Sequence, residues 1–187
     1  MTKILDGKAV SQRIKDEVKA QNESLLKKGI KIGLAVVIVG DDPASRVYVN
    51  NKKKACEYVG FRSFEYALPE SATEDELLKL VKKLNDDDNV NGILVQLPLP
   101  KHINEEAVIN AINPKKDVDA FHPQNVGKIM TGDYDFLPCT PAGVMELIKE
   151  SGIDPCGKEC VVLGRSNIVG KPQAMLLLHA NGTVTIC

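Results

Sequence analysis

The residues that could do chemistry begin with a lysine inside a predicted helix. The helix spans Pro43–Val59 and contains three consecutive lysines at positions 52–54. A helix advances about 100° per residue, so Lys52 lies about 40° from Tyr48 on the apolar face, and Lys53 points to the opposite side. Partial desolvation on that face favours the neutral amine, which can exchange protons near neutral pH. Lys52 is therefore a candidate acid–base catalyst. The alternative is a snorkelling lysine whose stem packs and whose head reaches water.

A second polar residue, Gln96, closes a predicted buried strand over residues 92–97. In open α/β sheets, the carboxyl ends of the strands form the edge at which ligands bind. Gln96 could orient a neighbouring lysine or hydrogen-bond a heterocycle there, or it could simply be a satisfied polar residue at the end of the strand. Asp117 and Asp119 fall in a long loop at the same level, where most aspartates only form turns.

The last stretch of the sequence predicts a phosphate-binding unit. Residues 160–187 have the pattern of a buried strand, a glycine turn at Gly164, a helix and a second strand. Such a unit directs backbone N–H groups and a helix N-terminus toward a phosphate, and Arg165 could pair with that phosphate. The alternative for Arg165 is an ordinary surface arginine. The motif is not GxGxxG, since five residues separate Gly164 from Gly170, and it is not a P-loop, because Lys171 is followed by Pro172.

The elements that must position these residues alternate between strands and helices. The continuous apolar run of residues 34–39 predicts a strand covered on both faces. Further strands are predicted over residues 61–68 and 92–97, and helices over residues 8–28, 43–59, 104–112 and 140–151, with one more helix that begins at the capping box of Thr73 and Glu76. The alternation predicts a parallel α/β sheet with right-handed crossovers. Residues 113–141, rich in Asp, Pro and Gly, are predicted to form loops.

Composition excludes several functional classes. A formal net charge of −1 gives no electrostatic footprint for nucleic acid or an anionic membrane, and no apolar run approaches the length of a bilayer span. The five cysteines contain no CxxC pair, which favours reduced structural thiols in a cytoplasmic protein over a zinc site.

Taken together and in order, five segments resemble the bifunctional methylenetetrahydrofolate dehydrogenase/methenyltetrahydrofolate cyclohydrolase family. They are residues 45–60, 92–100, 114–119, 138–143 and 162–172. The resemblance covers nearly the whole chain. It implies a parallel α/β catalytic domain that binds folate over residues 1–140. Residues 141–187 would then form the first βαβ unit of a Rossmann-like NAD(P)-binding domain that is cut short.

The resemblance also implies a reaction and roles for residues. Hydride would leave the carbon that bridges N5 and N10 of methylenetetrahydrofolate for NADP, with NAD as the alternative, and water would open the methenyl cation to 10-formyltetrahydrofolate. Lys52 would be the principal acid–base group, positioned by Gln96, and Asp119 would hold the amino edge of the pterin. The implied residues are Lys52, Gln96 and Tyr48 for catalysis; Tyr48, Val95, Gln96, Leu97 and Asp119 for substrate; and Gly164, Arg165 and Ser166 for cofactor. A homodimer is implied as well.

Two departures from the family pattern and two alternatives stand beside this hypothesis. Ala120 occupies a position where the family commonly has glycine, and the sequence ends at Cys187, where relatives continue. The first alternative is therefore a truncated fragment that binds folate, with cyclohydrolase activity at most. The second is a short-chain dehydrogenase, because Tyr48 and Lys52 have YxxxK spacing. In that class the tyrosine follows the glycine-rich turn, whereas here it precedes the turn.

Overall fold

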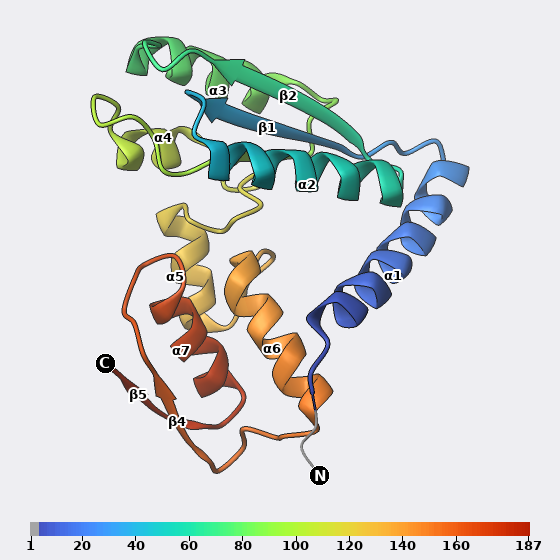
Figure 1. Cartoon of the computed structure of the whole chain (residues 1–187), viewed down its shortest axis with the longest axis vertical. Helices are drawn as coiled ribbons and strands as arrows, with labels where there is room; N and C mark the ends of the chain where they lie inside the picture. Colours follow the sequence, from blue (N-terminus) through green and yellow to red (C-terminus); the bar gives the residue numbers. More distant parts are fainter. Residues whose placement is uncertain (1–3) are drawn as a thin grey trace. The chain divides into compact units, whose positions relative to one another are not determined.

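The structure, a computed structural model, describes residues 4–187 (Figure 1). The chain divides into two compact units, one formed by residues 13–118 and the other by the residues up to 12 together with 119–187. The predicted domain boundary near residue 140 stays a prediction. Residues 1–3 of the predicted first domain lie outside the described residues.

The unit of residues 13–118 is built on a three-stranded parallel sheet with the strand order β2-β1-β3. Its elements are most of α1 (Gly7–Lys27), then β1 (Gly33–Val39), α2 (Pro43–Val59), β2 (Arg62–Leu68), α3 (Glu74–Asp86), β3 (Gly92–Val95) and α4 (Glu105–Ala111). The parallel α/β arrangement predicted from the sequence is confirmed.

The central strand β1 is covered on both faces, as its continuous apolar run predicts. Ala35, Val37 and Val39 belong to the cluster that includes buried side chains of α3 and α4. Val36 and Ile38 instead pack with Val49 of α2. Burial of two opposite rows explains why the strand has no polar alternation.

Both ends of α2 are capped. Pro43 stands at the first helical position, and the Asp42 side chain accepts a hydrogen bond from the Ser45 N–H. At the other end, Gly60 has a φ of 81°, and the buried Asn22 side chain donates to the carbonyls of Val59 and Gly60. A Cβ on Gly60 would lie 2.9 Å from Asn22 Nδ2, so this turn requires glycine. The caps fix where α2 begins and ends.

The segment that leads out of this unit is held against α3. The Lys116 ammonium donates to three carbonyls at the C-terminal end of α3, those of Leu84, Asn85 and Asp87, at 3.1, 2.8 and 2.9 Å. The Lys116 carbonyl in turn accepts from Ile93 N–H at 2.7 Å. The segment therefore lies beside β3.

The second unit contains the predicted βαβ motif. Its helices and strands are α5 (Pro123–Thr131), α6 (Cys139–Ser151), β4 (Glu159–Val162), α7 (Gly170–His179) and β5 (Thr183–Ile186), and β4 pairs with β5 in parallel.

Two predictions about this unit were wrong. Residues 113–141 are not all loop, because α5 lies among them. This helix begins at Pro123, with His122 as its N-cap residue, and it ends before Gly132, which has a φ of 81°. The strand β4 was expected to be buried, but Val161 is 63% exposed and Leu163, just after the strand, is 86% exposed. Among the described residues, only β5 pairs with β4.

Across residues 4–187, no helix combines the length and the apolar character needed to cross a membrane.

Candidate active site

The three lysines of α2 lie in different surroundings. Lys52 is half-buried, whereas Lys53 and Lys54 are exposed. The Lys52 ammonium lies 5.8 Å from the centroid of the Tyr48 ring, within cation–π range. Tyr48 itself is 59% exposed, which leaves much of its ring available to a ligand. The helical-face prediction correctly separated Lys52 from its two neighbours.

Lys52 reaches from α2 to the end of β3. Its Nζ donates to Gln96 Oε1 at 3.0 Å, and Gln96 Nε2 donates to the Leu97 carbonyl at 2.7 Å. The second bond fixes which end of the amide faces the lysine, because only the oxygen is left to accept. Gln96 N–H also donates to the Val37 carbonyl at 2.8 Å, so the backbone of Gln96 is tied to β1. One ammonium therefore has a defined acceptor at the carboxyl edge of the sheet.

The residues on either side of Gln96 differ in exposure. Val95 is buried in the core between the sheet, α3 and α4, whereas Leu97 is half-buried and packs against that core. Their assignment to folate binding stays a prediction.

Asp117 and Asp119 have different surroundings. Asp117 is 2% exposed and forms an isolated parallel bridge with Ile93, beside β3. Asp119 belongs to the second unit, is half-buried, and its Oδ1 lies 3.9 Å from the Cys139 sulfur, which donates to it. The structure brings Lys52, Gln96 and Tyr48 together within one unit, and the predicted convergence of Asp119 with them stays a prediction.

Ala120 is under backbone strain. It has a φ of 55° and is fully buried. The left-handed region disfavours any residue with a Cβ, so glycine would adopt this conformation with less strain than Ala120 does.

The turn after β4 lies directly against the start of α7. A Cβ on Gly170 would lie 2.0 Å from the Gly164 carbonyl oxygen, so the turn and the start of α7 approach each other too closely for a side chain. Ser166 Oγ accepts from Val169 and Gly170 N–H groups at 3.1 and 3.3 Å. Ser166 thus supplies a hydrogen-bond acceptor for two backbone N–H groups at the start of the helix. The exposed Arg165 is the cationic side chain of the turn. The sequence reasoning missed the role of Gly170, which its spacing from Gly164 could have suggested.

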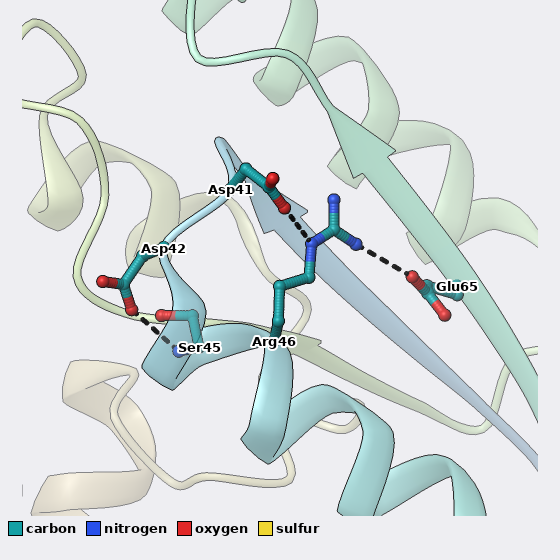
Figure 2. A network of polar contacts seen from close by, with 5 residues as sticks. All are labelled: Asp41, Asp42, Ser45, Arg46 and Glu65. Atoms are coloured by element: carbon teal, nitrogen blue, oxygen red, sulfur yellow. Dashed lines mark hydrogen bonds and ion pairs between the residues drawn. The ribbon is translucent and has the colours of Figure 1, made fainter.

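A polar network at the start of α2 was also missed, although Asp-Pro before a helix is a recognisable start signal. Figure 2 shows the Arg46 guanidinium between Asp41 and Glu65, at 2.7 and 3.2 Å, with Ser45 N–H donating to Asp42 at 2.7 Å. The backbone hydrogen bond from Ser45 is the main cause that lowers the pKa of Asp42. The network ties α2 to the segment after β1 and to β2.

Comparison with known proteins gives consistent results for both parts of the chain. The family profile described as "Tetrahydrofolate dehydrogenase/cyclohydrolase, catalytic domain" matches residues 5–119, and that described as "Tetrahydrofolate dehydrogenase/cyclohydrolase, NAD(P)-binding domain" matches residues 138–187. The bifunctional protein FolD of Acetivibrio thermocellus is 71% identical over 185 residues, which are 99% of this chain and 65% of that protein.

Solved structures agree with the sequence relatives. The crystal structure of the bifunctional enzyme FolD from Campylobacter jejuni matches with a TM-score of 0.95 and 53% identity, over 99% of this chain and 66% of that one. FolD of Trypanosoma brucei, complexed with NADP cofactor and inhibitor, matches with a TM-score of 0.95 and 40% identity, over 99% of this chain and 64% of that one. The chain spans about two thirds of the length of the curated relatives it matches.

Proposed function

Because the chain belongs to the tetrahydrofolate dehydrogenase/cyclohydrolase family, we propose that it acts in one-carbon folate interconversion. The proposed activity is NADP-dependent oxidation of 5,10-methylenetetrahydrofolate to the 5,10-methenyl form, followed by hydrolysis to 10-formyltetrahydrofolate. The observation that carries the proposal is the hydrogen bond from Lys52 to Gln96 beside Tyr48, at the carboxyl edge of the sheet.

In the proposed hydrolysis, Lys52 carries out the proton transfers. Lys52 acts from its deprotonated form: the amine accepts a proton as water adds to the methenyl carbon, and the resulting ammonium donates a proton to N5 as the bond between that carbon and N5 breaks. The hydroxyl proton of the intermediate leaves to solvent, so one proton is released overall and the formyl group stays on N10. Gln96 accepts a hydrogen bond from the lysine and holds its nitrogen in place throughout.

The remaining assigned side chains suit the folate. The exposed ring of Tyr48 offers a flat surface on which the folate can pack. A carboxylate such as Asp119 accepts hydrogen bonds from the amino edge of a pterin. Val95 and Leu97 complete the proposed folate set on either side of Gln96.

The turn after β4 fits a dinucleotide. Gly164 and Gly170 keep the turn free of side chains where the backbone approaches α7, and Arg165 supplies a forked donor for a phosphate. Ser166 braces the turn through its two hydrogen bonds to the start of α7. When bound, NADP would accept the hydride from the methylene carbon. The NADP complex of the Trypanosoma brucei relative supports this choice of cofactor.

A paired assay on the 187-residue protein tests the proposal, with hydrolysis of methenyltetrahydrofolate and reduction of NADP by methylenetetrahydrofolate followed separately. Both activities are expected. Hydrolysis alone would restrict the proposal to the cyclohydrolase, the activity that the fragment hypothesis allows. The absence of both activities in a folded sample would contradict the proposal.

The proposed homodimer predicts twice the chain mass by light scattering at micromolar concentration, and a monomer would contradict it.

A further inference from the structure

Polar contacts supplement apolar packing in fixing the rotation of α2 on the sheet. Val49 packs against Val36 and Ile38 of β1, Cys56 and Val59 are also buried, and the helix contacts both β1 and β2. Close packing of these side chains already restrains the helix, and directional polar contacts add a further restraint on its rotation about its own axis. Because α2 carries both Tyr48 and Lys52, any roll moves both of them.

Two sets of polar contacts connect this helix to different parts of the sheet. On the β2 side, Arg46 Nη1 donates to Glu65 Oε1 at 3.2 Å, and Arg46 Nε donates to Asp41 Oδ1 at 2.7 Å. On the β3 side, Lys52 Nζ donates to Gln96 Oε1 at 3.0 Å. Since β2 and β3 flank β1, the two links extend from the helix in opposite directions across the sheet.

The angular separation of the two links makes them interdependent. Arg46 and Lys52 lie about 120° apart around the helix. Side chains extend the helix to a radius of 5–6 Å, so a roll of about 10° displaces their ends by about 1 Å. A roll that opened the arginine pairs would thus displace the Lys52 nitrogen from Gln96 by an amount that matters for proton transfer.

We propose that Arg46, held between Asp41 and Glu65, is a positioning residue that fixes the roll of α2 and so keeps the Lys52 nitrogen on Gln96. This inference rests on the proposed function. Arg46 lies about 160° from Tyr48 around the helix, so it acts through the helix. The Arg46 and Asp41 side chains are 33% and 87% exposed, so solvent screens that pair, whereas the Arg46 and Glu65 side chains are 33% and 34% exposed, so their pair is the less screened restraint on the helix.

The first test replaces the guanidinium while keeping its apolar stem. Arg46→Met is expected to lower kcat for methenyltetrahydrofolate hydrolysis roughly threefold to tenfold with KM within about twofold, because misplacement of about 1 Å slows catalysis. Arg46→Lys, which can reach only one of the two carboxylates, is expected to fall between Arg46→Met and the unsubstituted protein. The control is Arg13→Met, which breaks an exposed pair with Glu17 at 2.9 Å on α1 and should leave kcat unchanged.

Two further measurements separate positioning from general damage. With Lys52→Met already present, Arg46→Met should cause no additional loss of the residual rate, whereas a merely structural role would lower both backgrounds equally. The NMR signal of the Gln96 side-chain amide should shift in Arg46→Met and not in Arg13→Met. This readout needs no activity, so it decides the role of Arg46 even if the folate assay fails. An unchanged kcat in an otherwise active protein, or an unshifted Gln96 signal, would overturn the inference.

Discussion

At the scale of single residues, positions 52–54 show how one side chain among three alike becomes chemically distinct. Lys52 is half-buried and bonded to Gln96, whereas Lys53 and Lys54 face solvent. Helical spacing and the position of Tyr48 were enough to single out Lys52 from sequence. Its hydrogen bond to Gln96 links residues 44 apart, and no local pattern encodes that distance.

Replacement of the two adjacent lysines tests this distinction. Lys52→Met should lower kcat for hydrolysis by a factor of roughly 10² or more, because general acid–base groups typically contribute that much. Lys53→Met, which removes the same charge one residue further along, should stay within about twofold. Steady-state kinetics on both variants, with circular dichroism as the check on folding, gives the comparison. Similar losses in both would refute the assignment.

Ala120 supports a prediction about backbone strain. Ala120→Gly relieves the left-handed conformation but adds freedom to the unfolded chain, so the free energy of unfolding should change by less than about 1 kcal/mol. Ala120→Val places a β-branched side chain at a φ of 55° in a fully buried site, and should cost about 2 kcal/mol or more. Urea denaturation measures both. Equal stability of the valine and glycine variants would contradict the strain.

At the scale of elements, periodicity and capping signals located most helices and strands of the described chain. The helix predicted over residues 43–59 has the observed bounds, and the capping box of Thr73 and Glu76 is present. The missed helix α5 has only nine residues and begins at a histidine cap, so its apolar period is short and its start signal uncommon. The exposure of β4 could not be predicted from sequence. An apolar run predicts that a strand can be buried, but it does not show which neighbouring elements are there to cover the strand.

We expect replacement of Lys116 to lower the free energy of unfolding far more than replacement of the adjacent Lys115. Lys116→Met removes the donor shared by three carbonyls at the end of α3, so the free energy of unfolding should fall by about 1–3 kcal/mol. Lys115→Met, at an exposed position, should change it by less than about 0.5 kcal/mol. Urea unfolding curves provide the values. If the two variants were equally stable, the three hydrogen bonds would contribute nothing measurable.

The cap of α2 predicts a pH dependence of stability. The pKa of Asp42 is lowered from 3.8, mainly by the backbone hydrogen bond from Ser45, so the folded protein binds this proton more weakly than the unfolded chain does. The contribution of the carboxylate is therefore fully present above the unfolded value and is lost as pH falls through the folded value. Asp42→Asn, which keeps a good cap without ionising, should show a smaller drop in thermal midpoint between pH 6 and pH 3. An identical drop in both proteins would show that other groups dominate.

At the scale of the whole molecule, the cysteines are divided between the two units. Cys56 is buried in the unit of residues 13–118, and the other four, at positions 139, 156, 160 and 187, belong to the second unit. Burial raises the pKa of the Cys56 thiol, with a smaller contribution from Glu57, so the reactive thiolate is scarcer there.

Alkylation should therefore distinguish the two units. Brief treatment with iodoacetamide at pH 7.5 should label the exposed Cys139, Cys156 and Cys187 first and leave Cys56 unmodified until the unit around it opens. Mass spectrometry of peptides from native and urea-treated samples reads out each site. Rapid native labelling of Cys56 would show that its unit opens readily.

The strand order β2-β1-β3 also determines when the proposed catalytic pair can form during folding. The central strand gains both of its neighbours from later in the chain, and the partner of Lys52 arrives only when β3 docks against β1. Parallel pairings between distant segments form slowly because loop closure precedes any gain from contact. A collapsed chain that has paired only β1 with β2 would therefore hold Lys52 without Gln96. The rate at which hydrolysis activity recovers during refolding would then measure the rate at which β3 docks against β1.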